Sequence, residues 1–171
     1  MNKKIAIFLI TVLVVTMVFI YSGYINVTTT YRNISTQVES QQQKRADLTD
    51  MYNAARERSL ILLEMLSLKD EFELDDSSQA LGQQAMLFIE ARKNLMQQTL
   101  NAEELRLLTT QNALTSQNAP LQNQVAQLLI DGNRGRALDL LFESALPAQN
   151  EILNNISKVL DLDTLYSQEL V

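Results

Sequence analysis

The chain of 171 residues has no cysteine, no histidine and no tryptophan, and only 4 glycines and 2 prolines. Without cysteine or histidine it cannot build a disulfide, a thiol nucleophile, a zinc-hydrolase site or a histidine general base. So little glycine and proline argues against a β-sandwich or barrel and favours long helices. We therefore expect an all-α protein that is not an enzyme and uses no cofactor. Mg²⁺ or Ca²⁺ bound by carboxylates is the metal chemistry still open.

The charges are unbalanced toward acid. The sequence has 14 Lys and Arg against 20 Asp and Glu, which gives a formal net charge of -6. An acidic surface repels phosphate backbones, so nucleic-acid binding is not expected.

One apolar segment stands out from this polar composition. From Ile5 to Tyr24 the chain carries no charge for about 20 residues, the length that a helix needs to cross a bilayer core of roughly 30 Å. Lys3 and Lys4 precede the segment, so the positive-inside rule places residues 1–4 in the cytoplasm. The sequence thus predicts a single transmembrane helix over residues 5–24, with residues 25–171 outside the cytoplasm.

A cleaved signal peptide is the alternative for this segment, because the two lysines also make a basic start. The apolar run exceeds the roughly 7–15 residues of a signal-peptide core, and residues 21–24 offer no clear small-x-small cleavage site. These features favour an uncleaved anchor. The lack of cysteine fits a bacterial envelope protein, so we expect the inner membrane, with residues 25–171 in the periplasm.

Residues 25–171 carry the periodicity of four helices, over about residues 27–73, 77–99, 102–130 and 134–170. Apolar and small residues recur at alternating spacings of three and four, which is typical of helices that pack on other helices. The sequence therefore predicts an N-terminal transmembrane helix that continues into an antiparallel up-down-up-down four-helix bundle. The predicted seams are Leu48, Tyr52, Ala55, Ser59, Leu62 and Leu66; Leu81, Gln84, Phe88, Ala91 and Leu95; Leu105, Leu108, Asn112, Thr115, Ala119, Gln122, Ala126 and Leu129; and Leu138, Leu141, Ala145, Ala148, Ile152, Val159 and Tyr166.

Capping residues indicate where these helices begin. Asp76 and Ser77 are good N-cap types for the second helix, and Asn101 with Glu104 makes a capping-box pattern at the start of the third. Residues 131–135, with the sequence DGNRG, break the pattern before the fourth helix.

Two prolines lie inside predicted helices. Pro120 and Pro147 each remove a backbone hydrogen bond and should bend the helix. Alternatively, Pro120 could split the third helix in two.

This part of the chain resembles the four-helix-bundle sensory domain of bacterial methyl-accepting chemotaxis receptors and of membrane-bound diguanylate cyclases and phosphodiesterases. The resemblance rests on the segments MYNAARERSLILLEML, KDEFELDD, FIEARKNL and PLQNQVAQLLIDGNRGRALDLLFESALPAQNEILNNI. The last is the most telling, because its Gly-containing turn, its Ala-Leu-rich helix start and its Ala-Leu-Pro-Ala-Gln sequence are similar to the family's final helix.

The resemblance implies a homodimer with the first helix at its interface, which binds a small molecule or a periplasmic binding protein. In the family a second span, a HAMP relay and a cytoplasmic output domain follow the bundle, and this sequence holds none of them. The fourth predicted helix points back at the membrane, so we expect the parent protein to continue into a second crossing.

A signalling function follows from this architecture. A packed helix that is continuous with a membrane span moves as a rigid element, so it can transmit a ligand-induced shift of about 1–2 Å. We therefore expect the sensor module of a transmembrane transducer, of the chemoreceptor or cyclic-di-GMP signalling type. The alternative is a membrane-anchored scaffold or adaptor whose bundle binds a partner protein.

Three arginines are candidate ligand-binding residues: Arg56 and Arg58 in AARERS, and Arg92 in EARKNL. Arg58 lies on an apolar-flanked edge of the first helix, where a partly desolvated guanidinium could bind a carboxylate or another anion. Arg92 could approach from the second helix. Alternatively, such arginines extend toward solvent or pair with nearby glutamates, here Glu57, Glu64 or Glu90.

Polar residues at seam positions are the other candidates. Asn112, Thr115 and Gln122 could line a small-molecule pocket between helices. The competing interpretation, which we prefer, is that they specify the helix register through buried hydrogen bonds.

The acidic run over residues 69–76 lies at the predicted membrane-distal turn. It lacks the spacing and the glycine of an EF-hand, so we expect a solvated loop with capping acids rather than a cation site. Phe72 and Leu74 should close the end of the bundle.

Overall fold

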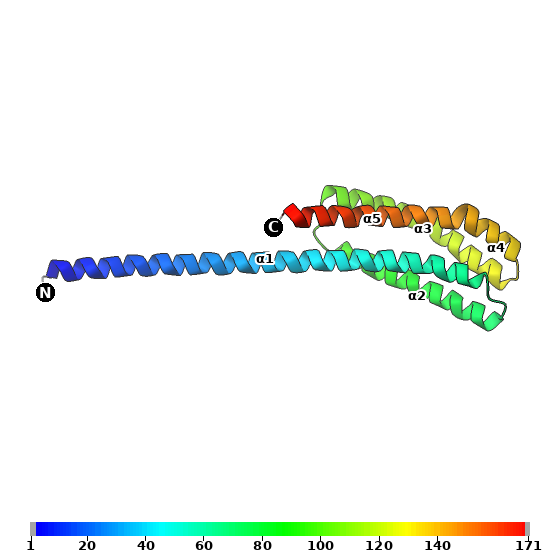
Figure 1. Cartoon of the computed structure of the whole chain (residues 1–171), viewed down its shortest axis with the longest axis horizontal. Coiled ribbons are helices and arrows are strands. Elements are labelled where there is room, and N and C mark those ends of the chain that lie inside the picture. The colour runs from blue at the N-terminus through cyan, green and yellow to red at the C-terminus, as the bar shows by residue number, and fades with distance from the viewer. Residues whose placement is uncertain (1–2, 170–171) are drawn as a thin grey trace. The chain divides into compact units, whose positions relative to one another are not determined.

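The computed structural model describes the backbone of residues 3–169 and the side chains of residues 16–17, 19–25, 31 and 34–164. It is all-helical, as predicted, and the described residues contain no strand. The elements drawn in Figure 1 are α1 (Lys3–Met65), α2 (Glu71–Leu95), α3 (Ala102–Ile130), α4 (Arg134–Leu140), a π-helical turn η1 (Leu141–Ala145) and α5 (Leu146–Glu169).

The chain divides into two compact units, Met1–Ser40 and Gln41–Val171. Residues 3–40 of the first unit belong to α1. In the second unit the rest of α1 lies alongside α2, α3 and α5 (Figure 1), and these four helices share an apolar core. The candidate site lies inside this second unit.

The predicted membrane span over residues 5–24 falls largely outside the described side chains, which do not include residues 5–15 and 18. Among the residues that are described, no helical stretch combines the length and the apolar character that crossing a bilayer requires. The span stays a prediction from the sequence.

Two apolar clusters make up the core of the Gln41–Val171 unit. They are separated along the helices: on α1 the first cluster ends at Ala55, the second begins at Ile61, and the buried Arg58 lies between them. The first cluster contains Leu48, Met51, Ala54, Ala55, Phe88, Ala91, Leu95, Leu107, Leu108, Ile152, Ile156 and Val159. The second contains Ile61, Leu62, Met65, Leu74, Leu81, Val125, Ala126, Leu128, Leu129, Ala137, Leu141 and Ala145.

The start of α2 corrects the predicted helix boundary. Asp70, and not Asp76 or Ser77, is the N-cap, because its carboxylate accepts the backbone N–H groups of the second and third residues after it. Glu71 and Glu73 then occupy the first turn, where the helix dipole favours negative charge. The acidic run is therefore mostly the beginning of a helix and not a loop.

The end of α1 differs from the prediction for a tertiary reason. The helix stops at Met65 rather than near residue 73, and Arg134 of α4 donates hydrogen bonds to the backbone carbonyls of Leu66 and Leu68 in the connection. A side chain distant in sequence thus satisfies carbonyls that a longer helix would have paired internally.

Of the two residues predicted to close the end of a bundle, one is buried in the core. Leu74 is buried in the second cluster, whereas the prediction for Phe72 is wrong, because its side chain is 83% exposed.

Both ends of α3 follow from local sequence. At its start the Glu104 backbone N–H donates to the Asn101 side chain, and the Asn101 backbone N–H donates to the Glu104 side chain. These two bonds form the predicted capping box. At its end Gly132 has a φ of 75°, and the N–H groups of Gly132 and Asn133 bond to the carbonyls of Leu129 and Leu128. This Schellman arrangement explains the predicted break.

The two prolines have different effects. α3 continues from Ala102 to Ile130 through Pro120, so the alternative of a split third helix is wrong. Pro147 instead lies two residues after the end of η1, whose last bond runs from the Leu146 N–H to the Leu141 carbonyl five residues earlier. The wider turn accommodates a proline ring that would otherwise clash with the carbonyl four residues back.

Candidate functional site

Four polar side chains separate the two apolar clusters. Arg58 comes from α1, Asn118 and Gln122 from α3, and Gln149 from α5, and all four are buried. We call them the polar layer. Because buried polar groups cost free energy unless they are hydrogen-bonded, the layer must satisfy its own donors and acceptors.

Arg58 is the cation of this layer, and its side chain is held only by neutral oxygens. Its Nε donates to Gln122 Oε1 at 2.7 Å, its Nη1 to the Leu81 carbonyl at 2.7 Å, and its Nη2 to Asn123 Oδ1 at 3.3 Å. No glutamate or aspartate pairs with it among the described residues. Burial lowers the pKa of Arg58 below its ordinary value, although a guanidinium stays protonated at any physiological pH.

Gln149 connects three helices through its amide group. Its Oε1 accepts from Asn118 Nδ2 at 2.8 Å and from Gln122 Nε2 at 3.0 Å, and its Nε2 donates to the Ala55 carbonyl at 2.6 Å. Together with the Arg58–Gln122 bond, this gives a continuous network from α1 through α3 to α5. A displacement of one helix therefore changes the hydrogen bonds of the others.

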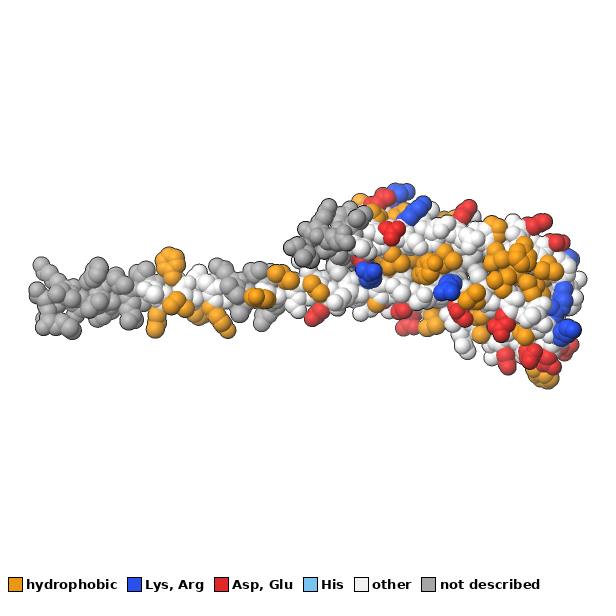
Figure 2. All heavy atoms as spheres, in the orientation of Figure 1, with side chains coloured by type: hydrophobic (Ala, Val, Ile, Leu, Met, Phe, Trp, Pro, Cys, Tyr) orange, Lys and Arg blue, Asp and Glu red, His pale blue; other side chains and the backbone are white. Residues whose placement is uncertain are grey.

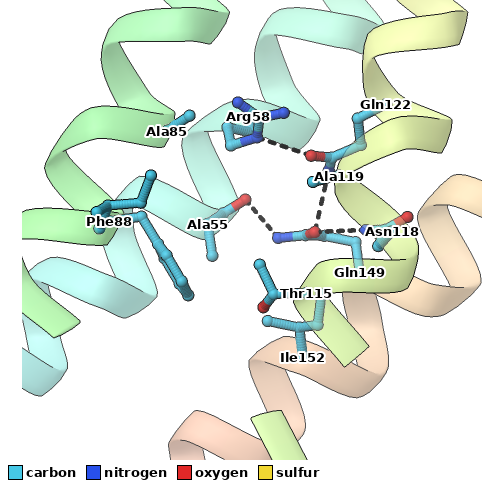
Figure 3. Close-up of a pocket in the computed structure, with 11 residues that line it drawn as sticks. Ala55, Arg58, Ala85, Phe88, Thr115, Asn118, Ala119, Gln122, Gln149 and Ile152 are labelled. Atoms are coloured by element: carbon cyan, nitrogen blue, oxygen red, sulfur yellow. Dashed lines mark hydrogen bonds between the residues drawn. The ribbon is translucent and has the colours of Figure 1, made fainter. Parts of the chain in front are cut away.

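A cavity of about 90 Å³ lies beside the polar layer, lined by side chains of α1, α2, α3 and α5. Figure 3 shows Arg58 and Gln122 at one end and Phe88, Thr115 and Ile152 toward the other. Most of the wall is apolar, so the charged end and the apolar end can hold different parts of one molecule. The lining residues are Ala55, Arg58, Ala85, Phe88, Ile89, Thr115, Asn118, Ala119, Gln122, Gln149 and Ile152.

The structure brings together three of the six residues predicted as possible ligand contacts. Arg58, Thr115 and Gln122 all line the cavity. Arg56 is exposed, Arg92 is only partly buried and not in the lining, and Asn112 is exposed, so these three do not belong to this cavity. The expected glutamate partners of Arg58 are also not used.

The predicted seam of α3 was wrong at two positions of its first half, whereas Leu108 is buried as predicted. Leu105 and Asn112 are exposed, whereas Gln111 and Asn118 are buried. Gln111 and Gln122, with Thr115 and Asn118 between them, recur at spacings of four and three, so a better signal was present in the sequence. It was missed because adjacent polar residues, such as Gln111 and Asn112, carry no intrinsic preference for the buried face.

A second buried polar group, the ion cluster, lies elsewhere in the same unit. Lys44 Nζ of α1 is 3.0 Å from Glu104 Oε1 of α3 and 3.9 Å from Asp163 Oδ1 of α5. One ammonium thus faces two buried carboxylates. Burial raises the pKa of Asp163, Lys44 opposes the shift, and Glu104 adds to it. This cluster joins the same three helices as the polar layer, but it lines no cavity described for this part of the chain.

An open groove of about 430 Å³ lies between α1 and α2 and includes three carboxylates. Asp47, the most buried of them, accepts hydrogen bonds from Gln43 and Gln98. Within the described residues, no three acidic side chains come close enough together to hold a metal ion. The cavity beside Arg58 is therefore the better-defined candidate site.

Comparison with family models, with curated proteins and with solved structures gives no match for this chain. Function must be inferred from the geometry.

Proposed function

We propose that this chain is the extracytoplasmic sensor module of a bacterial transmembrane signal transducer. The observation that carries the proposal is the position of Arg58. It lies on α1, a single helix from Lys3 to Met65 that includes the predicted membrane span, and it is also part of the polar layer beside the cavity. A ligand in this cavity would act directly on the helix that leads to the membrane.

The proposal includes the predicted architecture and location. The four long helices would form an antiparallel up-down-up-down bundle in the periplasm, anchored in the inner membrane by residues 5–24. Two copies would associate through α1, and a small molecule or a periplasmic binding protein would be the stimulus. The core shared by α1, α2, α3 and α5 supports a bundle.

Signalling would use the polar layer as a two-state element. Hydrogen bonds are directional, so the Arg58–Gln122–Gln149 network favours particular registers of α1, α3 and α5. A ligand that replaces one of these bonds stabilises one register over another and shifts their populations. The result is a small displacement of α1.

The location is tested by labelling. Because the chain has no cysteine, Ser67→Cys in the exposed α1–α2 connection introduces a unique thiol. We expect a membrane-impermeant maleimide to label this variant in spheroplasts as fully as in lysed cells. Labelling only after lysis would overturn the proposed orientation.

The signalling role is tested by joining the chain to a second span and the output domain of a characterised chemoreceptor. A functional sensor should give an output that changes when compounds are added to the periplasm. Ala119→Leu, which fills the cavity, should remove that response. A chimera whose output no compound alters would contradict a sensory function.

A scaffold or adaptor function is the second candidate, supported by exposed apolar side chains on α2. Met86, Leu87 and Ile89 are each more than half exposed, and Figure 2 shows apolar patches among the charges on one face of the molecule. For an adaptor, Met86→Glu with Leu87→Glu, two exposed positions of α2 outside the cavity lining, should abolish function in cells while Ala119→Leu has no effect. A sensor should show the reverse.

A further inference from the structure

We propose that the cavity beside Arg58 binds a short-chain aliphatic monocarboxylate, with its carboxylate on the Arg58 guanidinium and its alkyl chain against Phe88 and Ile152. The inference rests on the proposed sensory function and names its ligand class. It is carried by the combination of a buried cation that has no anionic partner among the described residues and an adjoining cavity with apolar walls.

Arg58 has donor capacity for a carboxylate. A guanidinium has five N–H donors, and the hydrogen bonds to protein oxygens use one each on Nε, Nη1 and Nη2. The weakest, at 3.3 Å, goes to Asn123, whose side chain is exposed. A carboxylate can replace that amide at little cost, because Asn123 then hydrogen-bonds to water. Hydrogen bonds between ionised partners are roughly twice as strong as neutral ones.

Small side chains on three helices create the space for the alkyl chain. Ala55 of α1, Ala85 of α2 and Ala119 of α3 all line the cavity (Figure 3), and larger residues there would fill it. A cavity of about 150 Å³ accepts benzene, so one of about 90 Å³ has room for about three or four carbon atoms. Together with a carboxylate, this matches an acid of the size of butyrate.

The same geometry excludes other anions. A dicarboxylate would place its second charge against Phe88 and Ile152, where no cation compensates it and desolvation is costly. Phosphate and sulfate have no apolar part to fill the apolar end. A neutral amide of the same shape loses the charge-assisted bond to Arg58, which we expect to weaken binding about 10- to 100-fold.

The test measures binding of butyrate, butyramide and succinate to the full chain in nanodiscs by isothermal titration calorimetry. We expect saturable binding of butyrate, binding of butyramide about 10- to 100-fold weaker, and no binding of succinate. Equal binding of butyrate and butyramide, or no binding of butyrate, would overturn the proposal.

Three variants locate the site. Arg58→Met should lose the preference for butyrate over butyramide, and Ala119→Leu should lose both ligands by filling the cavity. Arg56→Met is the matched control, since its exposed guanidinium is two residues away on the same helix, and it should bind like the original chain. Circular dichroism checks that each variant folds; if Arg58→Met does not, Ala119→Leu decides. Butyrate binding that survives the filled cavity places the ligand elsewhere and contradicts the inference.

The chimeric receptor separates this inference from the proposed function. If butyrate binds through Arg58 but the output never responds to any compound, the ligand site stands and the sensory function fails. If the output responds to other compounds and butyrate does not bind, the sensory function stands and the ligand class is wrong.

Discussion

At the scale of single residues, the two buried cations of the Gln41–Val171 unit are treated in opposite ways. Lys44 lies within 4 Å of two carboxylates, as its distances of 3.0 Å to Glu104 and 3.9 Å to Asp163 show. Arg58, which is 7% exposed, contacts only neutral oxygens. Taking a charge out of water is costly, and dipoles compensate it less completely than an anion does. The two carboxylates compensate the charge of Lys44 within the fold. The burial of Arg58 is better explained by a ligand whose negative charge compensates the guanidinium.

The ion cluster makes stability depend on pH through Asp163. Burial raises the pKa of this carboxyl above its ordinary 3.8, so between the two values the folded protein holds a proton that the unfolded chain has released. The contribution of Asp163 to the free energy of unfolding therefore increases as the pH falls through the folded pKa. At neutral pH this contribution is least favourable. Asp163→Asn should stabilise the protein most at neutral pH, and this gain should shrink in acid.

Urea denaturation of both proteins between neutral and acidic pH measures this difference. Asp161→Asn, at an exposed position two residues earlier on α5, is the control and should show a small difference that does not vary with pH. A pH-independent gain for Asp163→Asn would mean that its carboxyl is not perturbed in the folded state.

Gln149 should be the most sensitive uncharged position of the polar layer. Replacing it with alanine leaves the amide groups of Asn118 and Gln122 and the Ala55 carbonyl without their shared partner. Unpaired buried polar groups cost about 1–3 kcal/mol each, so with three groups affected we expect the free energy of unfolding to fall by at least about 3 kcal/mol. Asn150→Ala, exposed on the same helix, should change it by less than about 0.5 kcal/mol. Similar values for both variants would show that the network contributes little.

At the scale of elements, α3 shows how far local sequence reaches. Its bounds and its capping box are as predicted, because caps depend on residues three or four positions apart. Which of its polar residues are buried was partly mispredicted: Asn112 is exposed and Gln111 is buried. Adjacent polar residues carry no intrinsic preference for either face, so packing against α5 and α1 decides between them.

Two glycines around the α3–α4 connection provide a matched pair of substitutions. Gly132 has a φ of 75°, a conformation that costs an L residue roughly 1–2 kcal/mol, so Gly132→Ala should destabilise by about 1 kcal/mol. Gly135 lies inside α4 with open space around its Cα, so Gly135→Ala should stabilise by about 0.5–1 kcal/mol. Chemical denaturation measures the free energy of unfolding of both variants. If Gly132→Ala does not destabilise the protein, Gly132 does not need its left-handed conformation.

At the scale of the whole molecule, the core residues that the structure describes lie after Ser40. Both apolar clusters, the polar layer and the ion cluster belong to the Gln41–Val171 unit. Deleting residues 1–40 should therefore leave a cooperatively folded protein whose free energy of unfolding falls by at most about 1 kcal/mol, from fraying at the new end of α1.

Removing seven more residues is the control for this deletion. A chain that starts at Leu48 lacks Lys44 and leaves the carboxylates of Glu104 and Asp163 buried without their ammonium. Breaking a buried ion pair costs about 3–5 kcal/mol, and urea denaturation followed by circular dichroism should show this loss. If both deletions unfold alike, Lys44 does not contribute to the stability of the core.

The sequence alone was sufficient for the helical class, the start and end of α3 and the break at Gly132, and it identified Arg58 as one of three candidate arginines. Each depends on composition, or on residues within about one helical turn of one another. Tertiary structure decided the end of α1, where Arg134 holds the Leu66 and Leu68 carbonyls, and it decided the partners of Arg58. The polar network joins residues as far as 94 positions apart, Gln149 and Ala55. Periodicity identifies which face of a helix is buried, but only packing determines which side chains of other helices meet there.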